Sequence, residues 1–444
     1  MGFFDKFWHA KVEETEQPNI RFGRYTDSYK LPGNYEAWDK ALLSFENGQY
    51  LDSYTHFFNY LRDEQEDNVR FWQEGEQIHF ELFQGSKKIT GFANKHKVKA
   101  EAKIAKTDDL NVGFMRRLIE KNFTLEYSRF SLDPQNNLCI IFDTYTLDGS
   151  PYKLYYALKE VAINADKQDD LLLDEFGMLQ EIDSSHLEDL QEAEKEAKHH
   201  FITKEVEKVI QEIQQGKLPF DQYPGAYVYL LLGLIYKLDY LTRPEGYLME
   251  RLEFAHRQYF AKDNKSTLEK AKDLVHELQK LLDRSKDAYF KEMYRGKSTF
   301  GITVPVNHDR VVSCIDNELA NMDWYLQNGH SKIGMGITSF IVGYCLFNYA
   351  VPKPGREFLE LYYRIIEVDF FKSIGFNFDY YQADQQQFNK KSIRKAIQRV
   401  AQRNRDRYPN IRPAINTLKY TSLPDFTKSY LLMIRDLDMS KVQS

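Results

Sequence analysis

Cysteine is scarce in this chain, and its placement excludes a disulfide framework. The three cysteines among the 444 residues are Cys139, Cys314 and Cys345, which lie far apart and in apolar surroundings. Small secreted domains instead carry many cysteines, because disulfides compensate for a core that is too small. The pattern therefore predicts reduced core cysteines and a cytoplasmic location.

Signatures of common enzyme chemistry are also missing. The sequence contains no P-loop, no G-x-G-x-x-G and no G-x-S-x-G, so it does not indicate the phosphate-binding loops or nucleophile turns that these motifs build. Gly334-x-Gly336 has neither a third glycine nor a preceding strand pattern. We therefore expect no cofactor and no enzymatic activity.

Long apolar runs are few. The run from Tyr227 to Tyr236 is too short to cross a bilayer, which requires about 20 apolar residues in a helix. The run from Ile333 to Ala350 approaches that length, but it contains three glycines and lacks a strong basic flank. We expect it to form a buried helix, and we expect no transmembrane span.

The clearest pattern that is present lies between Glu76 and Asp170. Apolar and polar residues alternate there as in half-buried strands, and Lys97 to Ile104 is typical of a strand with one solvated face. Turn-forming residues separate these runs, and two segments have helical spacing instead. The pattern predicts strands at about 77–84, 87–93, 97–105, 124–132 and 138–146, helices at about 109–122 and 151–168, and a preceding helical segment at 36–62.

The order of these elements resembles a known fold. With the preceding helix it is α-βββ-α-ββ-α, and it includes the local sequences Met115-Arg116-Arg117-Leu118 and Tyr127-Ser128-Arg129-Phe130. Over residues 36–172 the chain resembles the class I type III secretion chaperones and the related YbjN-like family. The resemblance implies a domain that binds another protein and pairs with itself. The expected self-association residues are Phe114, Leu118 and Tyr127.

The strand from Leu138 to Tyr145 suggests where a partner binds. It is apolar at successive positions, so both of its faces are expected to be apolar. One face must pack on the helices, and the other needs cover from the helical region or from a partner, because a large open apolar face is rare on a soluble monomer. We predict a partner polypeptide on that face. The predicted contact residues are Phe130, Leu132, Cys139, Ile141 and Tyr145.

Beyond the sheet the pattern becomes helical. Leu268, Ala271, Val275, Leu278 and Leu282 recur at the spacing of an amphipathic helix. The predicted fold class is α+β, with an antiparallel sheet followed by a large all-α region. The predicted parts are an extended lead-in at 1–34, a chaperone-like domain at 35–178 and a helical domain at 179–444, in which a break near 296–308 would separate two sub-bundles.

Two Glu-x-x-His motifs raise the question of a metal centre. They are Glu196-x-x-His199 and Glu253-x-x-His256, and pairs of this motif hold di-iron sites in helical bundles. The apolar stripe of the first helix, however, turns His199 toward water, and the second motif flanks the stripe of its own helix. We predict that no metal binds at these residues.

Positive charge is concentrated near the C-terminus. The net charge of the chain is −6, whereas Lys390 to Arg412 holds nine Lys or Arg against one Asp. Ile393, Ile397 and Val400 give this segment an apolar edge, so we expect an amphipathic helix with a basic side. That side is either a solvated surface or a contact for an acidic protein or nucleic acid. The basic patch comprises Lys390, Lys391, Arg394, Lys395, Arg399 and Arg403.

These observations favour a non-enzymatic protein-binding module, chaperone-like or adaptor, that binds a partner polypeptide through the sheet face and forms a homodimer. The alternative is a nucleic-acid-associated helical factor that uses residues 390–412.

Overall fold

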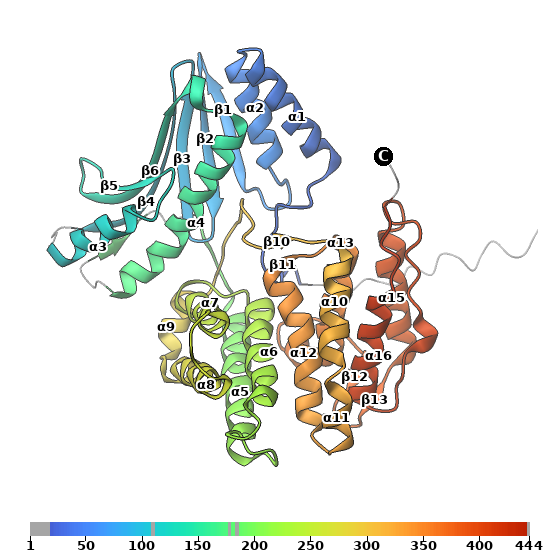
Figure 1. Ribbon diagram of the computed structural model, residues 1–444. Helices are drawn as coiled ribbons and strands as arrows, with labels where there is room; N and C mark the ends of the chain where they lie inside the picture. Colours follow the sequence, from blue (N-terminus) through green and yellow to red (C-terminus); the bar gives the residue numbers. More distant parts are fainter. Residues whose placement is uncertain (1–17, 108–111, 176–178, 183–185, 442–444) are drawn as a thin grey trace, which may run out of the picture.

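The protein has an N-terminal part built on a sheet and a larger helical part (Figure 1). The structure, a computed structural model, describes residues 18–107, 112–175, 179–182 and 186–441. Every pairing in the seven-stranded sheet is antiparallel. The predicted fold class, an α+β chain with an antiparallel sheet ahead of a helical region, is confirmed.

The sheet part begins with a helical hairpin, α1 (Pro32–Glu46) and α2 (Tyr50–Leu61). Its other helices are α3 (Val112–Asn122), after β4, and α4 (Pro151–Glu175), after β6. The strand order is β1-β2-β3-β4-β6-β5, and β7 pairs with the end of β4. The strands are β1 (Val69–Glu74), β2 (Gln77–Gln84), β3 (Lys87–Asn94), β4 (Lys97–Thr107), β5 (Arg129–Leu132), β6 (Asn137–Tyr145) and β7 (Leu179–Glu181).

The core of the sheet part lies on one face of the sheet. Successive side chains of a strand point to opposite faces, and in β6 this places Leu138, Ile140 and Phe142 in the core on the side of α4, while α2 covers β1, β2 and β3. The opposite face carries mostly exposed or half-buried side chains in β1, β2, β3, β4 and β6, although Phe83 and Cys139 on it are buried. It is called the outer face below.

Three features of this part differ from the prediction. β1 was not expected, because only Val69 and Phe71 mark its buried side. β5 begins at Arg129, because the preceding backbone N–H groups of residues 126–128 donate to the Glu160 carboxylate of α4 at 2.7–2.9 Å. α4 continues to Glu175. The sheet therefore has one strand more before α3 than the resemblance implies.

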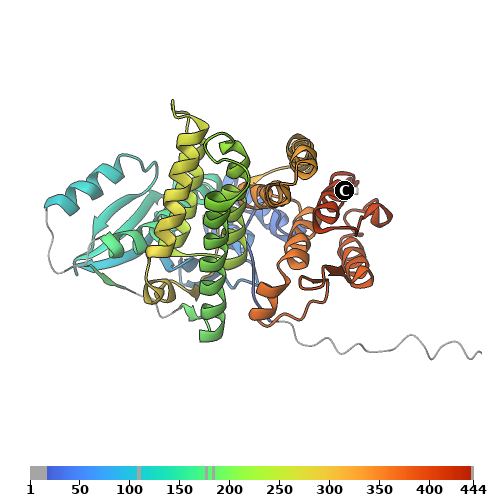
Figure 2. The ribbon, with the colours of Figure 1, turned by 90° about the horizontal axis from the view of Figure 1, so that it is seen from below.

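The helical region extends from α5 to α16, and Figures 1 and 2 show its helices following one another in the order α7–α9, α5–α6, α10–α12 and α15–α16. The helices are α5 (Glu192–Gln215), α6 (Pro224–Thr242), α7 (Gly246–Phe260), α8 (Thr267–Asp283), α9 (Lys286–Lys291), α10 (His308–Leu319), α11 (Met322–Gln327), α12 (Ser331–Asn348), α13 (Lys353–Ile366), α14 (Val368–Ser373), α15 (Lys390–Arg403) and α16 (Leu423–Arg435). Short ladders pair β8 (Glu188–Asp189) with β9 (Tyr294–Arg295), β10 (Val304–Pro305) with β11 (Tyr349–Ala350), and β12 (Tyr381–Gln382) with β13 (Gln387–Phe388).

The two most apolar helices, α6 and α12, pack against each other inside this region. Glycine allows the close approach, since a Cβ on Gly336 would lie 2.7 Å from a side-chain carbon of Leu230. The run that approaches a membrane span in length is therefore the buried helix that the sequence predicts. Among the described helices, none is long and apolar enough to cross a membrane.

Two extended segments join the parts. Residues 18–31 run along both parts, and Gly23 N donates to the Tyr240 carbonyl at 2.8 Å. Residues 296–306 follow α9, and Phe300 is buried in the core of the sheet part. Residues 1–17 of the predicted lead-in lie outside the described residues. The helices before and after the predicted break share one apolar core, so they form one packed region.

Candidate functional site

The outer face carries a row of aromatic rings at its β1 end. The register places Trp72, His79, Phe92, Lys99 and Asp143 side by side across β1, β2, β3, β4 and β6. The Trp72 and His79 rings are stacked, with centroids 5.7 Å apart and planes at 15°. Trp72 remains 44% exposed, so this row offers aromatic surface to solvent beside a sheet edge.

Charges of both signs flank the aromatic row. Asp143 pairs with Lys97 at 2.6 Å and with Arg129 at 2.7 Å, and these two hydrogen-bonded cations lower the pKa of its carboxyl. Lys99 pairs with Glu101 at 2.7 Å. The outer face is thus a mixed surface, polar and aromatic, rather than the apolar face that the sequence predicts.

The predicted partner-binding residues do not share one face. Phe130 and Leu132 contribute to the core of the sheet part. Cys139, Ile141 and Tyr145 alternate with core residues of β6 and lie on the outer face, where Tyr145 is 80% exposed. The prediction of one apolar surface from these five residues is wrong, because strand alternation separates them.

Cys139 lies in a polar setting. Its Sγ is 3.8 Å from an Oε of Glu101, and burial, together with that carboxylate, raises the pKa of the thiol to about 12. Glu101, Asp133 and Cys139 have ligand atoms within 4.8 Å of one another. Asp133 is held by Lys103 at 3.4 Å. A metal ion here would have to displace that lysine and deprotonate a thiol that its surroundings keep protonated.

The residues predicted for self-association also separate. Leu118 is buried in the core of the sheet part, whereas Tyr127 is 36% exposed beside β5. The side chain of Phe114 lies outside the described residues. Leu118 is therefore not available for a contact between copies, and the homodimer stays a prediction.

The Glu-x-x-His carboxylates both take part in ion pairs. Glu196 of α5 pairs with Lys286. Glu253 of α7 is buried between Arg24 at 3.0 Å and Lys167 at 2.6 Å. His256 Nδ1 lies 2.8 Å from the Tyr236 hydroxyl, and burial, with nearby Arg24, lowers the pKa of its ring to about 4. The absence of metal at these motifs stays a prediction, which elemental analysis of the purified protein tests.

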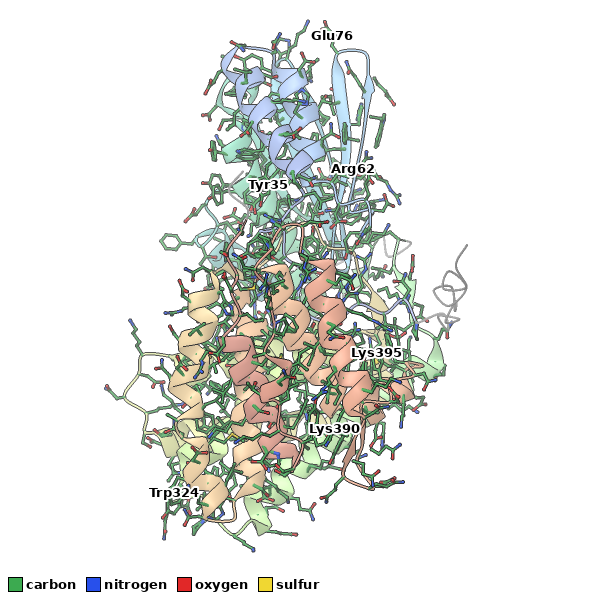
Figure 3. All side chains as sticks on the ribbon, turned by 90° about the vertical axis from the view of Figure 1, so that its right-hand side faces the viewer. Tyr35, Arg62, Glu76, Trp324, Lys390 and Lys395 are labelled. Carbon is green, nitrogen blue, oxygen red and sulfur yellow. The ribbon has the colours of Figure 1, made fainter. Side chains whose placement is uncertain are left out.

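The first part of the basic segment forms α15 (Lys390–Arg403), an amphipathic helix as the sequence predicts, whereas residues 404–412 lie beyond its end. Ile393, Ile397 and Val400 are buried. All six residues of the basic patch are exposed, and Figure 3 shows Lys390 and Lys395 on the side of the molecule that faces the viewer. Within the described residues, Arg403 alone among the six forms a salt bridge, at 3.7 Å from Glu357. The other five form no salt bridge there, although Lys390 lies over the Tyr420 ring, 5.3 Å from its centroid. Their positive charge is therefore not neutralised by a carboxylate of the described residues.

The aromatic row is the feature that sequence reasoning missed. Trp72 lies in β1, which the sequence pattern does not predict. His79 and Phe92 lie in predicted strands, but the pattern does not give the register between those strands. Contacts between strands set which side chains lie side by side across a sheet. The row can therefore be found only once the register of the strands is known. A scan of the sequence against protein-family models and a search of curated proteins return no match.

Proposed function

We propose that the protein is a non-enzymatic protein-binding module, chaperone-like or adaptor, which binds a partner polypeptide on the outer face of the sheet. The observation that carries the proposal is the aromatic row of Trp72, His79 and Phe92, in which Trp72 is exposed and the other two rings are half-buried. Aromatic residues are enriched at protein interfaces, because a rigid ring provides a large contact area at a small entropic cost. The resemblance to secretion chaperones, whose domains bind proteins, supports the same function.

The free edge of β1 adds a second means of binding. Phe83 N donates to the Asn68 carbonyl at 3.0 Å, so the antiparallel pattern directs the backbone groups of Phe71 and Gln73 away from β2. An extended segment of a partner can pair with such an edge and place its side chains over the neighbouring aromatic row. The proposed partner is therefore an extended segment with an apolar side chain that contacts Trp72.

Trp72→Ala tests this proposal. Capture of the native partner from cell extract, measured by quantitative mass spectrometry, is expected to fall by about tenfold or more, because truncation of a hot-spot residue, a class enriched in tryptophan, costs at least about 2 kcal/mol. The side chain is half-exposed, so the variant is expected to retain its circular dichroism spectrum and melting temperature.

Trp324→Ala is the matched control. Trp324 is 49% exposed and also stacks on a histidine, His330, at 6.1 Å. Figure 3 shows it at the opposite end of the molecule from Glu76, which lies in the turn after β1. The control is expected to capture as much partner as the wild type. Equal capture by both variants would remove the main support for binding on the outer face.

The exposed patch of α15 favours a second candidate function, nucleic-acid binding. Binding through this patch would weaken as salt rises, because each neutralised phosphate releases counterions. Lys391→Glu, Arg394→Glu and Arg399→Glu together are expected to abolish binding to a short single-stranded RNA, measured by fluorescence anisotropy. Failure of the wild type to bind RNA even at low salt would reject this second function.

A further inference from the structure

A cavity of about 270 Å³ lies where the lead-in, the sheet part and the helical region meet. Residues from these separate segments line it, and five of its side chains are cationic. They are Arg21, Lys198, Arg243, Arg295 and Lys297. Arg243 also lines two smaller cavities, of about 80 and 20 Å³, so it is common to all three.

The carboxylates in the cavity wall are shared between cations. Glu194 contacts Lys198 at 3.1 Å and Arg295 at 3.2 Å. Asp67 contacts Lys297 at 3.0 Å and a second cation outside the wall. The other carboxylates are Glu66, which pairs with Arg21, and the exposed Glu188. Because Glu194 and Asp67 each contact two cations, the carboxylates of the wall neutralise only part of its positive charge.

Arg243 is the least satisfied of these cations. Within the described residues it forms no salt bridge, and its hydrogen bond to the Gly296 carbonyl is long, at 3.4 Å. A guanidinium has five N–H donors in a planar fork. Most donors of Arg243 therefore have no acceptor among the residues that the structure describes, although the side chain lies in the wall of the cavity.

The backbone of Arg243 makes an arginine at this position costly. It ends α6 in the left-handed conformation, with φ 46° and ψ 68°. Glycine adopts this conformation without penalty, whereas the Cβ of another residue costs about 1–2 kcal/mol. The backbone thus favours glycine, and the role of an arginine must lie in its side chain.

Repulsion among the cations of the cavity wall also supports a role for the Arg243 side chain. Burial lowers the pKa of Lys198, and the charges of Arg243 and Arg295 lower it further despite its pairing with Glu194. Burial also lowers the pKa of Arg21, and Arg243 adds to this effect. An anion inside the cavity would relieve this repulsion.

We propose that the cavity binds a small phosphate-bearing molecule, with Arg243 as the principal ligand residue. The guanidinium fork matches two phosphate oxygens, and Lys198 and Arg295 supply further positive charge. The cavity volume is just below the range of about 300–1,000 Å³ that is usual for drug-sized ligands, which favours a small molecule over a polymer. The residues that line the cavity include none of the aromatic row, so the proposal does not rest on the proposed partner binding.

Isothermal titration calorimetry with inorganic phosphate and with pyrophosphate tests the proposal. Ionic strength is held constant, because salt screens charged interactions. The wild type is expected to bind at least one of the two anions saturably and tighter than about 1 mM. Arg243→Gly is expected to weaken that binding by at least about tenfold. Since glycine suits the left-handed backbone, this variant is expected to melt no lower than the wild type.

Arg399→Gln on α15 is the control, because it removes an exposed arginine from the other basic region of the protein. It is expected to bind phosphate and pyrophosphate as tightly as the wild type. The proposal fails if the wild type shows no saturable binding of either anion, or if Arg243→Gly binds as tightly as the wild type. It also fails if Arg399→Gln loses binding while Arg243→Gly retains it, because the anion then binds α15.

Discussion

Ile140→Asp is expected to unfold the sheet part, whereas the neighbouring substitution Ile141→Asp is expected to leave it folded. Ile140 is fully buried in the sheet core, beneath the helices. Ile141 is half-buried on the outer face, where its pairing partners are Glu101 and Arg129. The two isoleucines are adjacent in the sequence, and alternation along β6 alone gives them different surroundings.

The expected difference in stability is large. Loss of a buried isoleucine side chain costs about 2–5 kcal/mol, and an uncompensated buried carboxylate adds several more. The sum is comparable to the whole free energy of unfolding of a domain, which is about 5–15 kcal/mol. At Ile141 the new carboxylate stays in contact with water, and Arg129 on one neighbouring strand offsets the repulsion from Glu101 on the other, so the expected loss is about 1 kcal/mol.

Urea unfolding, monitored by circular dichroism, and limited proteolysis of the sheet part measure the stability of both variants. Ile140→Asp is expected to be cleaved within residues 32–175 in the absence of urea, while Ile141→Asp resists cleavage as the wild type does. Similar destabilisation by the two substitutions would show that the two faces of β6 are assigned wrongly.

Arg24→Met is expected to destabilise the protein by about 3–5 kcal/mol at neutral pH, because it leaves two buried carboxylates without their shared cation. Arg24 Nε and Nη2 donate to the Asp239 carboxylate at 2.9 and 2.6 Å, and Nη1 donates to Glu253 at 3.0 Å. The guanidinium also lies over the Phe347 ring, 3.9 Å from its centroid. Methionine keeps an apolar stem of similar length but satisfies neither carboxylate.

The loss is expected to depend on pH. Burial raises the pKa of Glu253, but Arg24 and Lys167 lower it more, and the net shift is downward from the ordinary value of 4.5. A lowered pKa contributes stability that is fully present above the unfolded value and is lost as pH falls. Asp239 differs, because burial keeps its pKa above the ordinary value even beside Arg24, and loss of that cation would raise it further. Both carboxylates are costliest to Arg24→Met when ionised, so its gap to the wild type is largest well above about pH 4.5 and narrows as pH falls, as unfolding measured over a pH series will show.

Arg257→Met serves as the control for Arg24→Met. Arg257 contacts the same carboxylate, Glu253, at 3.2 Å, but half of its side chain is exposed. Exposed ion pairs contribute about 0–1 kcal/mol, so this variant is expected to melt close to the wild type. An equal loss for both arginines would contradict the view that burial makes the Arg24 pairs important.

Alternation and helical spacing were sufficient to locate most elements of the sheet part. The strands β2, β3, β4 and β6 lie within a few residues of their predicted positions, because each has a buried face with a clear period of two. β1 was missed because only Val69 and Phe71 mark its buried side. The early part of predicted β5 was lost to the hydrogen bonds of Glu160, which lies about thirty residues further along the chain.

The binding surface was much harder to predict than the fold. Consecutive apolar residues in β6 suggested a surface apolar on both sides, but the sequence does not show that Lys99, Glu101 and Lys103 of β4 surround its outer half. The helix α15 was predicted correctly, because a basic amphipathic pattern lies within one element. A site within one helix or strand can be predicted from the spacing of its residues in the sequence. A site that spans several strands depends on the register between them.

By itself the sequence determined the α+β class, the division into a sheet part and a helical part, the buried apolar run of α12 and the basic helix α15. These follow from periodicity and composition, which act over neighbouring residues. Only the tertiary structure decided that Trp72, His79 and Phe92 form one row, that Arg24 neutralises Asp239 and Glu253, and that Arg243 faces a cavity with four other cations. Each of these contacts joins residues from separate elements, and folding brings them together through the packing of the whole chain.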